Sequence, residues 1–137
     1  MTEPSPVELL RPADLAAGVP YAYAATTGGR PLLVFTAGAC PLDERGSTVC
    51  AGDVVGQAEQ VMVNLRLALH AAGAQFDDVV KVTVYVARTD RSDLVVAWDV
   101  VHRHLGAHEP PATLLGVGAL GYPDQLVEVE AIAALGG

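Results

Sequence analysis

Two stretches of the chain carry apolar residues every three or four positions, the spacing of one face of an α-helix. The first runs over residues 54–72, with Asp53 placed as its N-cap and Gly73 placed to end it. The polar positions of this stretch predict its solvent-facing side: Gln57, Glu59, Gln60, Asn64 and Arg66. The second covers residues 92–105, capped by Ser92 and closed by the following glycine.

The remaining apolar segments are short and predict strands. Residues 79–87 alternate between valine and more polar side chains, which is typical of a half-exposed strand. Residues 32–36 are almost continuously apolar, which favours a strand buried on both faces. In the last strand, alternation puts Glu128, Glu130 and Ile132 on the same face. The other expected strands are residues 7–10, 21–27, 113–117 and 126–134.

The order of these elements predicts an α+β protein with one sheet and helices on one of its faces. A chain of 137 residues corresponds to a single domain, here with a loosely ordered start over residues 1–12. The sequence offers no third helix to cover the second face of the sheet. We therefore expect other subunits to cover that face.

Composition favours association with further copies and argues against polyanionic partners. Hydrophobic residues make up 51% of the chain and aromatic residues only 5%, so the core is aliphatic. A small chain with so many aliphatic residues often extends its apolar surface into an obligate interface with another subunit. The alternative is a monomer with a densely aliphatic core. The net charge is −8, and the eight basic residues are scattered. Binding to nucleic acid or to an anionic membrane is therefore not expected.

The first twelve residues carry Glu3, Glu8 and three prolines instead of the basic and apolar regions of a secretory signal. No stretch approaches the roughly 20 uninterrupted apolar residues of a membrane span. We therefore expect a cytoplasmic protein.

The cysteines and histidines follow no metal-ligand pattern. Cys40 and Cys50 are expected to be free thiols, as is usual in the cytosol, and a disulfide across the turn between them is the alternative. His102 and His104 are two residues apart and so face different sides of a helix. These two histidines and His108 lie near the end of the predicted helix, where a positive charge interacts favourably with the helix dipole. This explains them better than metal binding does. No metal is expected.

Four longer motifs and one dipeptide run in order over nearly the whole chain. Residues 35–43 are similar to F-x-S-G-Q-I-P-L-D, and residues 57–65 to Q-x-x-Q-x-x-x-N-L. Residues 71–85 follow A-A-G and then D-V-V-K-x-T-V-F, and residues 127–133 are similar to V-E-I-E-A-I-A. Pro20 and Tyr21 match an early G-P-Y, with valine in place of the glycine. Together these segments resemble the Rid family (reactive intermediate deaminase, YjgF-type).

The resemblance implies a chorismate-mutase-like fold, in which a mixed six-stranded sheet is backed by two helices. It also implies a homotrimer whose sheets face a barrel-like centre, with small-molecule clefts at the three subunit boundaries. In well-studied members these clefts hydrolyse reactive imines or enamines to ketoacids and ammonia, without a metal or another cofactor.

Two polar positions of the family's cleft are altered in this chain. Deaminating members carry an arginine, in P-A-R-S/T, whose guanidinium binds the substrate carboxylate through two parallel hydrogen bonds. Alignment on Pro-Ala puts Thr113 at that position, whereas alignment on the downstream Gly-Val puts Ala112 there. An asparagine of the family's second helix aligns with Trp98. The resemblance therefore predicts a more apolar cleft, with Leu114 and Leu115 among its lining residues.

Three further positions match the family's cleft. Glu128 matches the acidic residue that orients or activates water, and Tyr21 matches the tyrosine that closes the cleft and can stack on a planar ligand. Gly38 lets the backbone approach a ligand or a strand closely. Two carboxylates on one strand face are costly in a dry core, so Glu128 and Glu130 should meet water, a ligand or an interface partner.

Three functions compete. The first is a divergent hydrolase of an imine, an enamine or a related small carbonyl compound, with Glu128 as the catalytic residue. Weak activity on imines of simple amino acids is expected, and a substrate without a carboxylate would suit the cleft better. The second is a non-catalytic small-molecule-binding or regulatory trimer. A nuclease, a label sometimes attached to this family, is disfavoured by the acidic charge and the missing basic patch.

Overall fold

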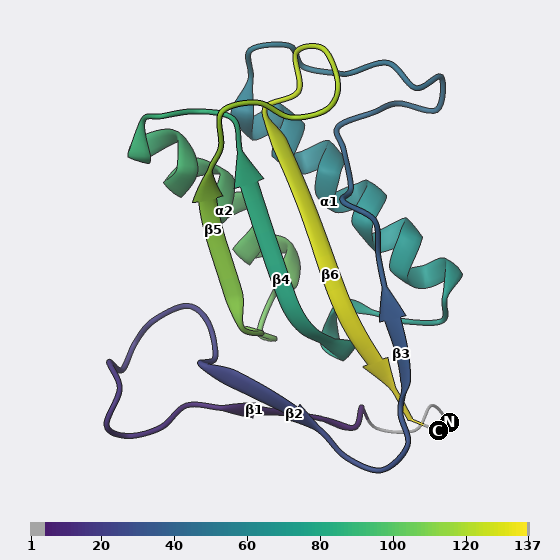
Figure 1. Ribbon diagram of the computed structural model, residues 1–137, viewed down its shortest axis with the longest axis vertical. Helices are drawn as coiled ribbons and strands as arrows, with labels where there is room; N and C mark the ends of the chain where they lie inside the picture. Colours follow the sequence, from purple (N-terminus) through teal and green to yellow (C-terminus); the bar gives the residue numbers. More distant parts are fainter. Residues whose placement is uncertain (1–4, 137) are drawn as a thin grey trace.

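The computed structural model describes residues 5–136, which form two helices over one face of a sheet (Figure 1). The elements are β1 Val7–Leu10, β2 Ala24–Thr27, β3 Leu32–Phe35, α1 Val54–Ala71, the 3₁₀ helix η1 Phe76–Asp78, β4 Val79–Val86, α2 Arg91–Leu105, β5 Ala112–Gly116 and β6 Val127–Leu135. Four strands pair in the order β3-β6-β4-β5, with β4 and β5 parallel and the other neighbours antiparallel. Strands β1 and β2 form a separate antiparallel ribbon, which lies below the sheet in Figure 1.

The α+β class and the layer of two helices are confirmed, but the six strands form two sheets instead of the single six-stranded sheet expected. The separation occurs between β2 and β3, where two glycines and Pro31 turn the chain. Gly29 has a φ of +70°, a left-handed conformation that glycine adopts without steric cost. The chain therefore changes direction here, and β2 pairs with β1 outside the four-stranded sheet.

The strand expected over residues 7–10 is present near the start of the chain. Val7–Leu10 forms β1, whose residues pair with β2 from Val7 opposite Thr27 to Leu10 opposite Ala24. Ladder hydrogen bonds fix the backbone of this strand. The first four residues of the loosely ordered start expected over residues 1–12 lie outside the described part of the chain.

The hydrophobic core lies between the two helices and the covered face of the sheet. Val82 and Val84 on β4 and Val129 on β6 are fully buried there. Met62 and Leu65 of α1 belong to the same packed cluster. The alternation predicted for both strands is confirmed, because the residues between the buried ones lie part-buried on the opposite face.

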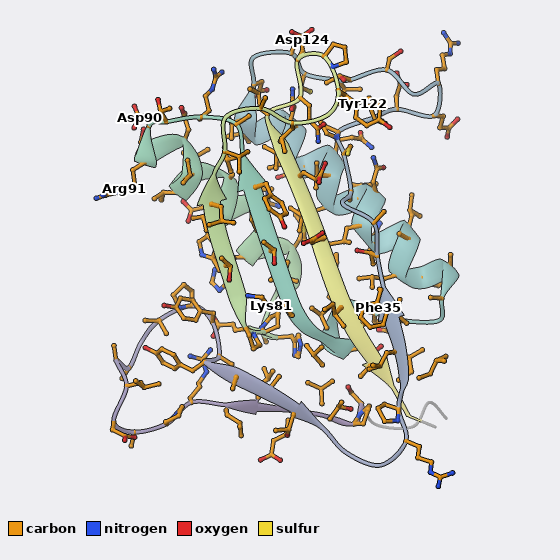
Figure 2. The ribbon with its side chains drawn as sticks, viewed as in Figure 1. Phe35, Lys81, Asp90, Arg91, Tyr122 and Asp124 are labelled. Carbon is orange, nitrogen blue, oxygen red and sulfur yellow. The ribbon has the colours of Figure 1, made fainter. Side chains whose placement is uncertain are left out.

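The opposite face of the sheet is not covered by either helix (Figures 1 and 2). Strand β3 is an edge strand, and Leu32, Leu33 and Phe35 are exposed, the last to 69%. The expectation that this run is buried on both faces is therefore wrong for a single chain, because no element of residues 5–136 packs over it. Clustered exposed apolar side chains of this kind are typical of an interaction surface.

Both helices begin at aspartate caps. Asp53 accepts a hydrogen bond from the Gly56 amide at 3.0 Å, as predicted. The cap of α2 is Asp90 instead of Ser92, because the Asp90 carboxylate accepts from both the amide and the hydroxyl of Ser92. Gly106 ends α2 as predicted. Neither helix in the described part of the chain is long and apolar enough to cross a membrane.

Candidate functional site

The carboxylate of Glu128 is held on the uncovered face of the sheet by residues from two loops. Its Oε1 accepts hydrogen bonds from the Cys40 thiol and from the Gln125 side-chain amide, each at 3.2 Å. Gly38 lies against the carboxylate, since a Cβ atom there would be 2.3 Å from Glu128 Oε2. We call Gly38, Cys40, Gln125 and Glu128 the carboxylate cluster. Both bonds go to Oε1, so Oε2 is left to accept from a water or a ligand.

The loop that follows β3 is bound to both β6 and α1. The Ala39 amide donates to the Val129 carbonyl at 2.7 Å, which attaches the loop to β6. From α1, the Asn64 amide donates to the carbonyls of Cys40 and Leu42, each at 2.9 Å. Asn64 therefore positions the loop of the carboxylate cluster, a role that its predicted place on a solvent-facing helix side did not indicate.

Gln57 is fully buried, and its predicted place on the solvent-facing side of α1 is wrong. Its amide donates to the carbonyls of Cys50 at 3.3 Å and Asp124 at 2.8 Å, and its Oε1 accepts from the Leu126 amide at 2.7 Å. These bonds join the turn before α1 to the loop before β6, where Asp124 is labelled in Figure 2. That loop includes Gln125, so Gln57 supports one of the two donors to Glu128.

The Cys40 thiol is a hydrogen-bond donor and keeps its proton at neutral pH. Burial, followed by the hydrogen bond to Glu128 and the charge of that carboxylate, raises the pKa of Cys40 to about 11. A protonated thiol is a poor nucleophile but can orient the carboxylate. Cys40 is half-buried and Cys50 exposed, and the two are free thiols.

We expect Gly38→Ala to displace the Glu128 carboxylate and to make Cys40 more reactive. The added methyl group would overlap the carboxylate, whose flexible end can move with little loss of stability. Without Glu128 the pKa of Cys40 falls from about 11, so more thiolate is present at pH 9. Alkylation of Cys40 by iodoacetamide at pH 9, in a Cys50→Ser background, should then be up to about tenfold faster.

The matched control is Gly28→Ala, because a Cβ atom there meets nothing within 4 Å. It should leave the alkylation rate unchanged. Equal rates in both variants would show that Glu128 does not govern the thiol.

The second carboxylate of this strand face is paired within the chain. The Tyr85 hydroxyl donates to Glu130 Oε1 at 2.6 Å, and this bond raises the pKa of Tyr85. In the strand register Tyr85 lies directly opposite Glu128. Glu130 therefore has one intrachain partner, on its Oε1, whereas Glu128 has two, both on its Oε1.

An apolar pocket of about 460 Å³ lies at the β5 edge of the sheet. Its lining residues are Pro20, Tyr21, Trp98, Ala112, Thr113 and Leu114. They come from the segment between β1 and β2, from α2 and from β5. Four of the predicted site residues are thus brought together, and the two aromatic rings suit a planar or apolar ligand.

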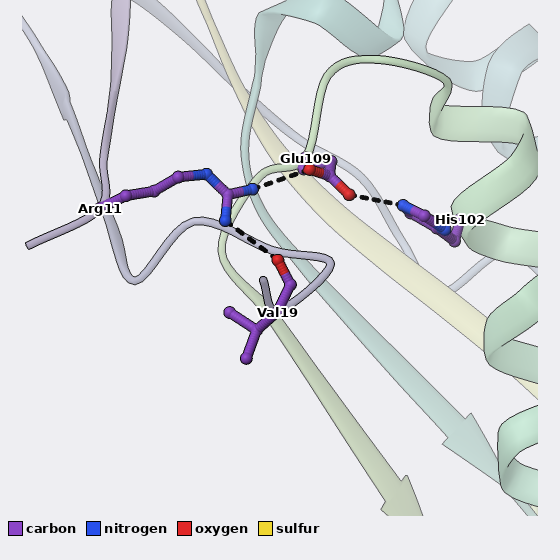
Figure 3. A network of polar contacts seen from close by, with 4 residues as sticks. All are labelled: Arg11, Val19, His102 and Glu109. Atoms are coloured by element: carbon purple, nitrogen blue, oxygen red, sulfur yellow. Dashed lines mark hydrogen bonds and ion pairs between the residues drawn. The ribbon is translucent and has the colours of Figure 1, made fainter. Parts of the chain in front are cut away.

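A network of polar contacts holds the wall of this pocket in place (Figure 3). Arg11 donates to the Val19 carbonyl at 3.0 Å and to Glu109 Oε1 at 2.8 Å. Glu109 Oε2 in turn lies 2.6 Å from His102 Nε2, and the His102 ring stacks on Trp98. Val19 directly precedes the two lining residues from the β1–β2 segment, so the network fixes them relative to α2. From the sequence, His102 was expected only to place a positive charge near the C-terminus of the helix.

Within one chain the predicted site residues fall into two groups. Glu128 and Gly38 belong to the carboxylate cluster and do not line the apolar pocket. Tyr85 of β4 lies opposite both Glu128 of β6 and Leu115 of β5, so two strand spacings, about 10 Å, separate these two. Leu115 is exposed and is not a lining residue of the pocket. A single chain therefore does not by itself bring together all the residues predicted for the cleft, which was expected at a subunit boundary.

No group of three or more His, Cys, Asp or Glu side chains within residues 5–136 is placed to hold a metal ion. All three clustered histidines have partners within the chain, His102 being bound to Glu109 as described above. His104 Nε2 lies 2.7 Å from Glu59 Oε2, and His108 Nε2 lies 2.8 Å from the Val79 carbonyl.

Comparison with known proteins agrees with this architecture. The family model described as Endoribonuclease L-PSP matches residues 12–135. A RutC family protein of Pyrococcus horikoshii is 35% identical over 114 residues, 83% of this chain and 86% of that protein. A 2-iminobutanoate/2-iminopropanoate deaminase of Capra hircus is 33% identical over 103 residues, 75% of this chain and 73% of that protein. The crystal structure of a Rid family protein of unknown function from Yersinia pestis has a TM-score of 0.84 and 29% identity, covering 95% of this chain and 99% of that one.

The two helices and the mixed sheet define a small α+β protein with the chorismate-mutase-like fold of these neighbours. The chain belongs to the Rid (YjgF) family. The resemblance found in its motifs is thereby confirmed.

Proposed function

We propose that this protein is a cytoplasmic homotrimeric hydrolase of a small imine, an enamine or a related carbonyl compound. The observation that carries the proposal is the carboxylate cluster, in which Glu128 is fixed on an uncovered sheet face with one oxygen left to accept from water. The deaminase of Capra hircus supports the class of reaction. In the proposed trimer, the apolar pocket of one subunit lies against the carboxylate cluster of the next, which unites the two groups of site residues.

Hydrolysis of an imine consumes one water and releases ammonia. Glu128 Oε2 accepts a proton from a water whose oxygen adds to the imine carbon, and the same proton passes from Glu128 to the imine nitrogen, which restores the carboxylate. The resulting amino alcohol loses ammonia when its carbon–nitrogen bond breaks, and the hydroxyl proton passes through Glu128 to the leaving nitrogen. Cys40 and Gln125 hold Oε1, so that Oε2 faces the water.

We expect weak turnover of imines derived from simple amino acids. Thr113 or Ala112 stands where the resemblance places an arginine, so a substrate carboxylate lacks a bidentate partner. Losing this clamp costs several kcal/mol in the transition state, or roughly a thousandfold in catalytic efficiency. A coupled assay, with an amino-acid oxidase supplying the imine and the protein at stoichiometric amounts, measures this. Turnover comparable to that of an arginine-containing relative would contradict it.

The trimer itself is tested by light scattering at micromolar concentration. The exposed Leu32, Leu33 and Phe35 and the uncovered sheet face support association. A monodisperse monomer would contradict the proposed assembly and, with it, the shared cleft.

A second candidate function is a non-catalytic small-molecule-binding or regulatory trimer. The apolar lining of the pocket favours it, because binding there needs no reactive group. The two functions differ in one measurement: a binder changes the fluorescence of Trp98 when it takes up a ligand but turns over no imine or carbonyl compound. The acidic charge continues to argue against a nucleic-acid partner.

A further inference from the structure

Lys81 is the only lysine of the chain and lies half-buried on the uncovered face of the sheet, as labelled in Figure 2. It belongs to β4, and its ammonium donates a hydrogen bond to the hydroxyl of Thr113 on β5 at 2.5 Å. Among residues 5–136, it takes part in none of the ion pairs, so no carboxylate oxygen lies within 4.0 Å of its Nζ.

An ammonium in this position is incompletely compensated. Its hydrogen-bond partner is neutral, and only one of its three donors is used in that bond. A partly desolvated charge without a counter-charge costs free energy, and an anion placed beside it recovers the Coulomb attraction. Glu130 lines the same cavity of the uncovered face as Lys81, but its Oε1 accepts from the Tyr85 hydroxyl and the two side chains form no ion pair within 4.0 Å.

Lys81 and Thr113 line two different cavities of the surface and are joined to each other by a hydrogen bond. Thr113 lines the apolar pocket that also contains Trp98. Lys81 lines a smaller cavity of about 180 Å³ on the uncovered face, together with Thr83 of β4, Thr36 after β3, Phe35 of β3, and Glu130, Ala131 and Ile132 of β6. Because the Thr113 oxygen accepts from Lys81, its own hydroxyl proton is available to a ligand in the apolar pocket.

We propose that Lys81 and Thr113 bind the carboxylate of the ligand, while the apolar part of the ligand packs against Tyr21 and Trp98. This assignment rests on the proposed function and names the group that the β5 edge recognises. An ammonium is a point charge without the planar fork of a guanidinium, so it binds a carboxylate less rigidly. The expectation that a ligand without a carboxylate suits the cleft better is thereby reversed.

The fluorescence of Trp98 provides a test, because it is the only tryptophan and lines the pocket. The probes are 2-oxobutanoate and 2-butanone, which differ only in a carboxylate replaced by a methyl group. Lys81→Met should weaken binding of 2-oxobutanoate by about tenfold or more and leave the weaker binding of 2-butanone unchanged. Lys81→Arg should retain most of the binding. Arg45→Met, which removes an exposed cation from a loop, should change neither probe.

Thr113→Val keeps the test decisive if Lys81→Met fails to assemble, as judged by light scattering. It retains the lysine and the side-chain volume but removes the hydroxyl. It should weaken the binding of 2-oxobutanoate severalfold and leave the binding of 2-butanone unchanged. The proposal is overturned if wild-type protein does not bind 2-oxobutanoate. It is also overturned if the variants bind 2-oxobutanoate as wild type does, or lose both probes equally.

Turnover separates this proposal from the proposed function. Binding of 2-oxobutanoate that depends on Lys81, without turnover of any imine, supports the carboxylate site and contradicts the hydrolase. Turnover of a carboxylate-bearing imine that Lys81→Met leaves unchanged supports the hydrolase and contradicts the carboxylate site.

Discussion

Replacement of Gln57 by leucine is expected to lower the free energy of unfolding by about 3 kcal/mol or more. Leucine fills nearly the same volume but leaves the carbonyls of Cys50 and Asp124 and the amide of Leu126 without their partner. Each buried polar group left unsatisfied costs about 1–3 kcal/mol. Urea unfolding followed by circular dichroism, at one protein concentration, measures the change as a shift of the midpoint with an unchanged slope.

The matched control is Gln60→Leu on the same helix. Its amide donates to the Asn64 side chain at 3.0 Å and holds no loop backbone. The expected loss is about 1 kcal/mol or less, because one side-chain hydrogen bond is removed. Equal destabilisation by the two variants would mean that the buried hydrogen bonds of Gln57 contribute no more to the free energy of unfolding than the single bond of Gln60.

Glu128→Gln is expected to reduce hydrolysis of any imine or carbonyl substrate by roughly a hundredfold to ten-thousandfold while leaving the trimer intact. Glutamine keeps the volume and one acceptor oxygen, so the contacts with Cys40 and Gln125 change little. An amide, however, does not accept a proton from water at neutral pH, so the proposed proton transfer is lost. The measurements are kcat/KM and light scattering.

Glu130→Gln provides the control, since it removes a carboxylate from the same face of the same strand. Glu130 is bound to Tyr85 and lies outside the carboxylate cluster, so this variant should keep activity close to that of wild type. Equal losses of activity in Glu128→Gln and Glu130→Gln would mean that the total negative charge of the strand face, and not Glu128 itself, supports hydrolysis. Full activity of Glu128→Gln would make Glu128 a structural residue.

The sequence by itself determined the elements of this protein. Helical spacing, with Asp53 and Gly73 at its ends, located α1, and alternation along β4 and β6 identified which side chains are buried. The motifs identified the family, and the resemblance predicted Tyr21, Trp98, Thr113 and Leu114 as cleft residues, which all line the apolar pocket. These features are readable because periodicity and capping depend on residues close together in the chain.

Only the tertiary structure decided which polar residues are structural and which are available for binding. The Cys40–Glu128 bond joins residues 88 positions apart, and the Lys81–Thr113 bond joins residues 32 positions apart. The burial of Gln57 likewise depends on two loops that pack against α1 from distant parts of the chain. Such contacts are set by strand register and by the turn between β2 and β3, which no local pattern encodes. The exposure of β3 also depends on tertiary packing, because only the packed arrangement shows that no other part of the chain covers this continuous apolar run.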